Sequence, residues 1–513
     1  MRTASLITPL LLAHLAASTP AAHAAPLDTL ANDATASAAT CPTRVNDTPR
    51  KLLSCIRSDA LWAHLVDLQA ISDAHPGADG HGNRDVGTTG YKASVDYVSQ
   101  LMTAAGYAVT VQPYTFIQQV VVGTPQLAID GVPEVHEQDF HVARLSGGGT
   151  LSAPAALASG TGTACDAQEL ASFPRGHVAL LQRGACRLDV QVAHAQAAGA
   201  AAVVLYNVSP VRDAAGKGRD DGAAYPARLV RPATLPVLGV LSYARGDALR
   251  TRTLAGHAPV VRVDVRTRAQ SGTDWNLIAE SPFGDPAHTV VVEGHLDSIY
   301  GAGILDNGSG SATILEIALN LAKTPTRNRL RYVWFGGEEV GLLGSAYYTQ
   351  NLSAAELQKI AFDVDADVTA TPNYVYLIAD PANASDRNRF PPNVVPGSAP
   401  GTQLFKDIFA QAGIPVRSAS FGNDGTDSNS FSLVGIPNTG ILTEQDCCKS
   451  SQEVATWGGA PGNYEGNWPG FDGGCVDRAR RWCDNLSNND PAVMEIASRA
   501  VAYVVLQLAG KAF

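Results

Sequence analysis

The chain has 513 residues, of which 45% are hydrophobic and 17% are charged, and its formal net charge is −11. This length is enough for two or three domains, each with its own core. An acidic balance without a basic run argues against binding to nucleic acid or to an anionic membrane surface. The composition therefore favours an acidic globular protein with neither kind of partner.

The N-terminal end has the pattern of a secretory signal peptide. One positive charge, Arg2, precedes an apolar stretch from Leu6 to Leu15, and small residues suited to cleavage follow at Ala22 and Ala24. The apolar stretch is too short to span a membrane, and no later stretch reaches the roughly 18 uninterrupted apolar residues that a spanning helix needs. We expect residues 1–24 to be removed and the mature protein to be secreted or periplasmic.

Between the signal peptide and residue 136, the sequence predicts a leader, two helices and a strand. Residues 25–40 are rich in Ala, Thr, Asp and Ser without periodicity, which is typical of a flexible leader. Apolar residues at helical spacing predict helices over Asp59–Ala74 and Tyr91–Ala105. Alternating apolar residues predict a strand over Val109–Ile117.

The cysteine count fits an oxidising compartment, because the chain contains eight cysteines, an even number. No Cys-x-x-Cys pattern suggests a metal site, so structural disulfides are the favoured interpretation. Eight cysteines allow 105 connectivities. The spacings suggest the pairs Cys41–Cys55, Cys165–Cys186, Cys475–Cys483 and the vicinal pair Cys447–Cys448.

Residues 288–345 hold three polar clusters, each directly after an apolar run. Thr289–Val292 predicts a short buried strand that leads to His295 and Asp297, which face one side if the strand continues. A second buried strand, Leu330–Phe335, is followed by two glycines and two glutamates. Between the two strands, the Gly-rich turn Asp306–Ser311 opens a segment with helical periodicity.

The carboxyl ends of strands in an open α/β sheet are where ligands bind, so these polar clusters are expected to converge. Carboxylates packed together repel one another, and a divalent metal is the simplest remedy. Histidine nitrogen and carboxylate oxygen suit Zn, Mn or Co better than Ca. A carboxylate such as Asp306 can bridge two ions, while one of the adjacent glutamates, Glu338 or Glu339, serves as base toward a metal-activated water. Taken singly, each cluster is more often a turn or a solvated helix start, but all three in this order are a much rarer coincidence.

Several segments resemble the M28 family of zinc aminopeptidases. The resemblance is carried by GHLDS, LDNGSGSATILEIA, YVWFGGEEVGLLGSAYY and NRDVGTTGYKASVDYVSQLMTAAGY. It implies an α/β fold with a mixed central sheet flanked by helices. The catalytic domain would comprise residues 41–136 and 266–513. Residues 137–265, with GHVALLQRGACRLDVQVAHAQAAGAAAVVLYN, resemble the smaller β-rich α+β protease-associated (PA) domain often inserted in these peptidases.

The resemblance also implies roles for individual residues, and the sequence departs from the family pattern at one metal ligand. The family's last metal ligand is a histidine, but this chain has no histidine after His295. Asp477 stands in the matching segment and is the candidate replacement; the alternative is that Asp477 is a loop acid and the second metal site is weak. The implied roles are His295, Asp306, Glu339 and Asp367 (with Asp365 the alternative to Asp367) as metal ligands, Asp297 as support for His295, Glu338 as general base, and a cis peptide between Asp306 and Asn307.

These implications predict a secreted metalloaminopeptidase that removes N-terminal, apolar residues from peptides with a free N-terminus. Two Zn²⁺ ions are expected, and the altered second site would also accept Mn²⁺ or Co²⁺. We expect a monomer. A different class, a degenerate peptide-binding protein without turnover, is the alternative that the missing histidine leaves open. A glutaminyl-cyclase-like enzyme with one zinc is a third and less favoured alternative, because such enzymes rely on the late histidine that is missing here.

Overall fold

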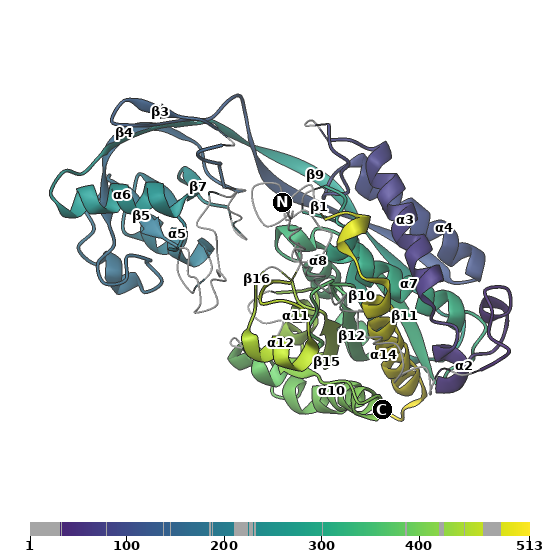
Figure 1. Cartoon of the computed structure of the whole chain (residues 1–513). Helices are drawn as coiled ribbons and strands as arrows, with labels where there is room; N and C mark the ends of the chain where they lie inside the picture. The colour runs from purple at the N-terminus through teal and green to yellow at the C-terminus, as the bar shows by residue number, and fades with distance from the viewer. Residues whose placement is uncertain are drawn as a thin grey trace, which may run out of the picture.

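The computed structural model describes residues 31–513 except 32, 78–79, 137, 144, 184–185, 187, 210–223, 225–228, 230–231, 300, 385–386, 420–424, 446 and 465–483. Two separate sheets, each flanked by helices, build the larger and the smaller part of the molecule (Figure 1). The larger part has a mixed sheet flanked by helices, as the sequence predicts.

The larger part is organised around an eight-stranded mixed sheet in the order β1-β9-β11-β10-β12-β15-β13-β14. Its centre is parallel: β10 pairs with β11 and β12, and β12 pairs with β15. Both β1 and β9 run antiparallel to their neighbours. The bounds are β1 Ala108–Val121, β9 Thr267–Glu280, β10 Asp285–His295, β11 Asn328–Phe335, β12 Ile360–Ala366, β13 Leu377–Ala379, β14 Arg417–Ala419 and β15 Asn438–Leu442.

Helices cover both faces of this sheet, because alternate residues of the central strands point to opposite sides. Val290 and Val292 of β10 join the main apolar core under α3, α4, α7, α10 and α14. Val291 packs on the other face with Phe431 of α11 and Tyr348 of α8. The bounds are α2 Pro49–Leu53, α3 Ser58–Ala74, α4 Thr89–Ala105, α7 Gly310–Leu321, α8 Leu343–Gln350, α9 Ala354–Leu357, α10 Val394–Gln411, α11 Ser428–Leu433, α12 Ser451–Trp457 and α14 Pro491–Gly510.

The helices predicted over Asp59–Ala74 and Tyr91–Ala105 are confirmed as α3 and α4. The ends of α4 follow from local chemistry: the Thr88 side chain accepts a hydrogen bond from the backbone N–H of Tyr91, and Gly106 ends the helix at a φ of 99°. The last helix, α14, is long and apolar enough to cross a membrane. However, 78% of its most apolar window is buried inside the protein, as in the core helix of a globular domain.

The smaller part contains a seven-stranded sheet in the order β3-β2-β8-β4-β5-β6-β7, with α5 and α6 packed on it. The long antiparallel pair β1 and β9 joins it to the larger part (Figure 1). The sheet begins with β2, before the predicted boundary at residue 137. The bounds are β2 Gln126–Ile129, β3 Val132–Glu134, β4 Gly149–Leu157, β5 Val178–Gln182, α5 Leu188–Ala197, β6 Ala202–Tyr206, β7 Val237–Leu241, α6 Tyr243–Leu254 and β8 Val260–Val265; the short pair β16 Cys447–Lys449 and β17 Gly462–Asn463 lies in the larger part.

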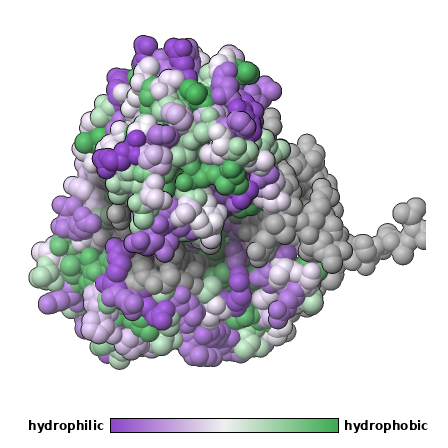
Figure 2. Space-filling view, turned by 90° about the vertical axis from the view of Figure 1, so that its left-hand side faces the viewer, coloured by the Kyte–Doolittle hydropathy of each residue, from purple (hydrophilic) through white to green (hydrophobic). Residues whose placement is uncertain are grey.

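The face shown in Figure 2 mixes hydrophilic and hydrophobic residues. The large exposed hydrophobic residues of the smaller domain stand at several separate places in the chain, including Val132, Leu254 and Val260. Isolated exposed hydrophobic side chains of this kind are normal on a globular protein.

The structure confirms two of the predicted disulfides, Cys41–Cys55 and Cys165–Cys186. The pair Cys475–Cys483 lies outside the described residues, as do the side chains of Cys447 and Cys448 and the predicted signal peptide. Part of the predicted leader is described: Asp33 forms an ion pair of 3.0 Å with Arg44, so this stretch is anchored to the domain.

Candidate metal centre

The candidate site lies at the carboxyl ends of three adjacent parallel strands. His295 is the last residue of β10, Glu338 follows β11 in a short 3₁₀ helix, and Asp367 directly follows β12. Asp306 comes from the segment Ile304–Ser309 that precedes α7. Because parallel strands end at the same edge of a sheet, residues more than 70 positions apart in sequence converge there.

Three side chains meet closely around the His295 ring. Its Nε2 atom lies 3.0 Å from Oδ1 of Asp306 and 3.4 Å from Oδ1 of Asp367. One ligand atom from each of these three residues lies within 4.8 Å of the others, which is the arrangement that could hold one metal ion. Glu338 approaches from the side, with Oε2 at 3.9 Å from the same nitrogen.

The donor set fits a divalent transition metal. Zinc takes histidine nitrogen and carboxylate oxygen at about 2.0–2.2 Å, and His295, Asp306 and Asp367 supply one nitrogen and two such oxygens. Burial by itself lowers the pKa of His295, but the nearby acids, Glu338 first among them, raise that pKa well above its usual range. So many acids around one buried ring leave an excess of negative charge, which a bound cation would neutralise.

Asp297 connects the histidine to the glutamates. Its backbone carbonyl accepts a hydrogen bond from Nδ1 of His295 at 3.0 Å, which leaves Nε2 facing the acids. Its two carboxylate oxygens accept hydrogen bonds from the backbone N–H groups of Glu338 and Glu339, at 3.2 and 3.3 Å. One buried residue, through its backbone carbonyl and its carboxylate, therefore contacts three of the residues that the sequence analysis selected.

The peptide between Asp306 and Asn307 is cis, as predicted. The backbone N–H of Asp306 donates to Oδ2 of Asp484 at 2.9 Å. The Asn307 side chain donates to the carbonyl of Ala366 and accepts from the backbone N–H of Val368, at 3.0 Å each. These contacts tie the loop that carries Asp306 to the end of β12, next to Asp367.

Asp367, the preferred residue of the two alternatives, is the one that the structure brings to His295. Asp365 lies deeper and is fully buried, and its Oδ2 accepts a hydrogen bond of 2.8 Å from Thr426. Opposite Asp365 on β10 stands Glu293, which is also fully buried. Burial raises the pKa of both carboxyls well above their usual values, which favours neutral acids beneath the site.

Sequence reasoning missed three residues that shape the site. Arg84 is fully buried and donates from three nitrogens to the carbonyls of Leu296, Ala302 and Gly303. The carboxylate of Asp484 accepts hydrogen bonds from the backbone N–H groups of Leu305 and Asp306. Gln445 donates from Nε2 to Oδ2 of Asp306, the oxygen that does not face His295. Arg84 stands in the segment NRDVGTTGYKASVDYVSQLMTAAGY, which carried part of the resemblance, but Asp484 and Gln445 lie outside the segments quoted for it.

Two predicted ligands remain outside the close group of three. Glu339 is 3% exposed, and its backbone N–H binds Asp297, which places it beside the site. Asp477 lies outside the described residues, so its predicted role stays a prediction.

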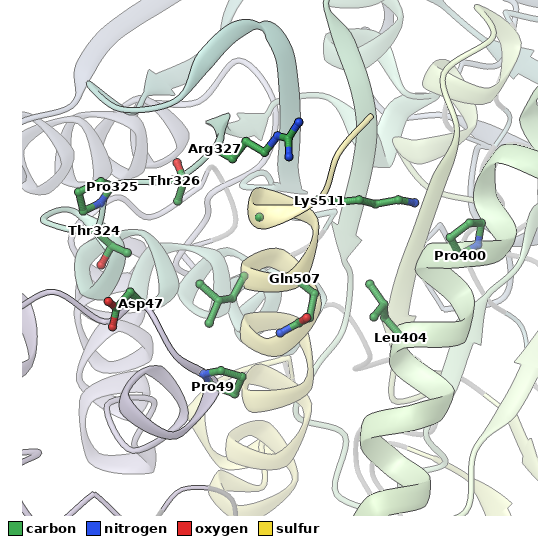
Figure 3. Close-up of a pocket in the computed structure, with 12 residues that line it drawn as sticks. Asp47, Pro49, Thr324, Pro325, Thr326, Arg327, Pro400, Leu404, Gln507 and Lys511 are labelled. Atoms are coloured by element: carbon green, nitrogen blue, oxygen red, sulfur yellow. The ribbon is translucent and has the colours of Figure 1, made fainter.

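A cavity of about 570 Å³ lies at the opposite end of the central strands (Figure 3). It is bounded by Thr324–Arg327 just before β11, by Pro49, by Leu404 of α10 and by Lys511 after α14. None of the residues of the candidate metal centre lines it, so it is separate from the chemistry at the carboxyl ends of the strands.

Comparisons with known proteins agree with this fold. The family model described as peptidase family M28 matches residues 276–505, and the PA domain model matches residues 149–249. An aminopeptidase of Pseudomonas aeruginosa is 33% identical over 473 residues, which cover 89% of this chain and 82% of the relative. Leucine aminopeptidase 2 of Trichophyton rubrum is 29% identical over 461 residues, covering 88% and 84%.

Solved structures show the same fold. The aminopeptidase from Aneurinibacillus sp. strain AM-1 matches with a TM-score of 0.67 and 20% identity, covering 91% of this chain and 97% of that one. A zinc aminopeptidase from Bacillus subtilis matches with a TM-score of 0.62 and 20% identity, covering 89% and 96%. The family match and the aminopeptidases among the relatives identify a metallo-exopeptidase. The chain belongs to peptidase family M28 and carries a PA domain.

Proposed function

We propose that the protein is a secreted metalloaminopeptidase that removes N-terminal residues, with a preference for apolar ones, from peptides with a free N-terminus. The observation that carries the proposal is the convergence of His295, Asp306 and Asp367 at the carboxyl ends of the central strands, with Glu338 beside them. The names of the relatives support the aminopeptidase activity and the apolar preference. The signal-peptide pattern and the disulfides support secretion.

His295, Asp306 and Asp367 would hold one divalent ion, with zinc as the expected metal. Such an ion polarises the scissile carbonyl and lowers the pKa of water from 15.7 to about 7. Glu338 accepts the proton of the attacking water and later returns it to the leaving amine. The hydrogen bond from its backbone N–H to Asp297 fixes the position of the backbone from which this side chain extends.

The second ion of the proposed pair would be held by Asp306, Glu339 and Asp477. This set contains only oxygen, because an aspartate stands where the family has its late histidine. An all-oxygen site is harder than a site with imidazole, so it would accept Mn²⁺ or Co²⁺ as well as Zn²⁺. We propose that the ligands of the second ion contribute less to binding than those around His295.

Hydrolysis of paired chromogenic amides tests this function. Leucyl 4-nitroanilide with a free amine and the same compound with a blocked amine are offered to metal-stripped protein, and then again after Zn²⁺, Mn²⁺ or Co²⁺ is restored. The proposal expects metal-dependent cleavage of the free form alone. Cleavage of the blocked form alone would keep a peptidase but reject an aminopeptidase. No cleavage of leucyl or other aminoacyl amides with any metal would favour a peptide-binding protein without turnover.

A further inference from the structure

The proposed base stands on a short loop that closes on itself. Residues 336–344, which we call the base loop, connect β11 to the first turn of α8 and carry Glu338. The backbone N–H of Gly344 donates to the carbonyl of Gly336 at 2.9 Å, so the two ends of the loop meet in a neck. At the tip of the loop, the backbone N–H of Glu338 donates to the carboxylate of Asp297. The direction in which the tip points therefore depends on how the neck is held.

One side chain of β9, the amide of Asn276, holds this neck. Its Oδ1 accepts a hydrogen bond of 3.3 Å from the backbone N–H of Gly336, and its Nδ2 donates to the carbonyl of Gly344 at 2.9 Å. Nδ2 also donates to Oε1 of Gln112, the residue opposite on β1, at 3.0 Å. Asn276 is fully buried, so loss of its amide would leave buried backbone groups of the neck without these partners.

A carboxamide matches this neck in both chemistry and space. Gly336 presents a donor and Gly344 an acceptor, and asparagine offers an oxygen and an NH₂ group side by side. An ionised aspartate would instead set an oxygen against the carbonyl of Gly344. A Cβ atom on Gly344 would lie 2.3 Å from Oδ1 of Asn276, and one on Gly336 would lie 2.3 Å from the hydroxyl of Tyr91. The neck therefore packs directly against its neighbours, with no room for adjustment by a side chain of its own.

We propose that Asn276 is a positioning residue for the proposed base: by clamping the neck of the base loop to β9, it sets where Glu338 stands beside His295. The inference rests on the proposed function of Glu338. The contacts of Asn276 described above do not involve His295, Asp306 or Asp367, so its loss should leave binding of the first zinc ion unchanged. A displacement of about 1 Å at a reacting group can cost about 100-fold in rate, so kcat should fall about 10- to 100-fold with little change in KM.

The test is a double-mutant cycle on the full chain with zinc restored and leucyl 4-nitroanilide as substrate. Values of kcat and KM are measured for wild type, Asn276→Leu, Glu338→Gln and the double variant. Leucine has nearly the shape of asparagine and lacks its hydrogen-bonding groups. Asn276→Ser carries the same cycle if Asn276→Leu does not fold, which thermal melts of the metal-free proteins check. A zinc titration of each protein measures the affinity for the first ion.

Asn328→Leu is the matched control. Asn328 is also a buried asparagine, and its Nδ2 donates to the carbonyls of Leu508 and Lys511, at 2.8 Å each. It stands at the start of β11, the end of the strand away from the base loop. This variant should lower the melting temperature and leave kcat unchanged, which separates a general loss of stability from misplacement of the base.

The expected result is a fall in kcat of about 10- to 100-fold for Asn276→Leu in the wild-type background, and little further loss in the Glu338→Gln background. Residues that act as a unit do not add in such a cycle. An equal loss in both backgrounds, a similar loss in the Asn328→Leu control, weaker binding of the first zinc ion or full activity of a folded Asn276 variant would each overturn the role of Asn276 alone. A loss of less than about tenfold for Glu338→Gln, or no hydrolysis by the wild type, would overturn the proposed function of Glu338 and the role of Asn276 with it.

Discussion

Asp297 accepts a hydrogen bond of 3.2 Å from the backbone N–H of Glu338, so the carboxylate behind His295 also positions the proposed base. The same carboxylate lies 3.5 Å from Nδ1 of His295. A change at Asp297 should therefore affect metal binding and the base together.

Replacement of Asp297 by Asn should weaken binding of the first zinc ion about 10- to 100-fold, because the negative charge 3.5 Å from Nδ1 of His295 is lost although the backbone carbonyl that accepts from this nitrogen remains. The asparagine amide has one oxygen and can still accept from one of the two backbone N–H groups, those of Glu338 and Glu339. Its NH₂ group cannot accept from the other, so one hydrogen bond is lost. Competition with a zinc-binding dye measures the dissociation constant. Asp96→Asn on the exposed face of α4 is the control. Equal zinc affinity in wild type and Asp297→Asn would show that the carboxylate has no such role.

Replacement of Glu338 by Gln should reduce kcat by about 10²–10⁴-fold, because the amide cannot accept the proton of the attacking water. The backbone hydrogen bond to Asp297 does not involve the side chain, so the local structure should persist. Bound zinc measured on the same sample should be unchanged. A loss of activity smaller than tenfold with zinc still bound would rule out Glu338 as the base.

Replacement of Asp477 by His would install the residue that the family has in this segment. We expect the second ion to bind more tightly, because imidazole nitrogen is a better ligand for zinc than an additional carboxylate in an already acidic site. Asp477→Ala should lose the second ion and keep the first. Zinc counted after equilibrium dialysis distinguishes these variants, with Asp472→Ala in the same segment as the control. If Asp477→Ala binds both ions as wild type does, Asp477 is a loop acid and not a ligand.

Asp274 should make the stability of the protein depend on pH. Burial raises the pKa of this carboxyl to about 8, with a further contribution from Asp297, whereas in the unfolded chain it is about 3.9. Between these two values the folded state binds more protons than the unfolded state, so the free energy of unfolding falls as pH rises from about 4 to 8.

Asp274→Asn removes this titration and keeps an oxygen that can accept the hydrogen bond from the backbone N–H of Gly87. Relative to wild type, the variant should be more stable by at least about 1 kcal/mol at pH 8, with a smaller difference at pH 5. Urea denaturation of metal-free protein at both pH values measures this. A stability difference that is the same at pH 5 and pH 8 would contradict the raised pKa.

Much of the fold and part of the site could be predicted from the sequence, because their signals are local. The apolar run before His295 and the run before Glu338 each form a strand within a few residues of the predicted position. The helix after Asp306 follows from apolar residues at helical spacing, and the turn before it from glycines and serines. The order of strand, polar end and helix then places these residues at one edge of a parallel sheet.

Only the tertiary structure decided which side chains meet. The choice of Asp367 over Asp365 depends on where β12 ends: Asp365 is buried within the strand, whereas Asp367 directly follows it and lies 3.4 Å from His295. The contact between Gln445 and Asp306 joins positions 139 residues apart, and that between Asp484 and Asp306 joins positions 178 apart. Periodicity and local composition carry no information about such pairs, because the chain brings them together only when the sheet and its covering loops pack.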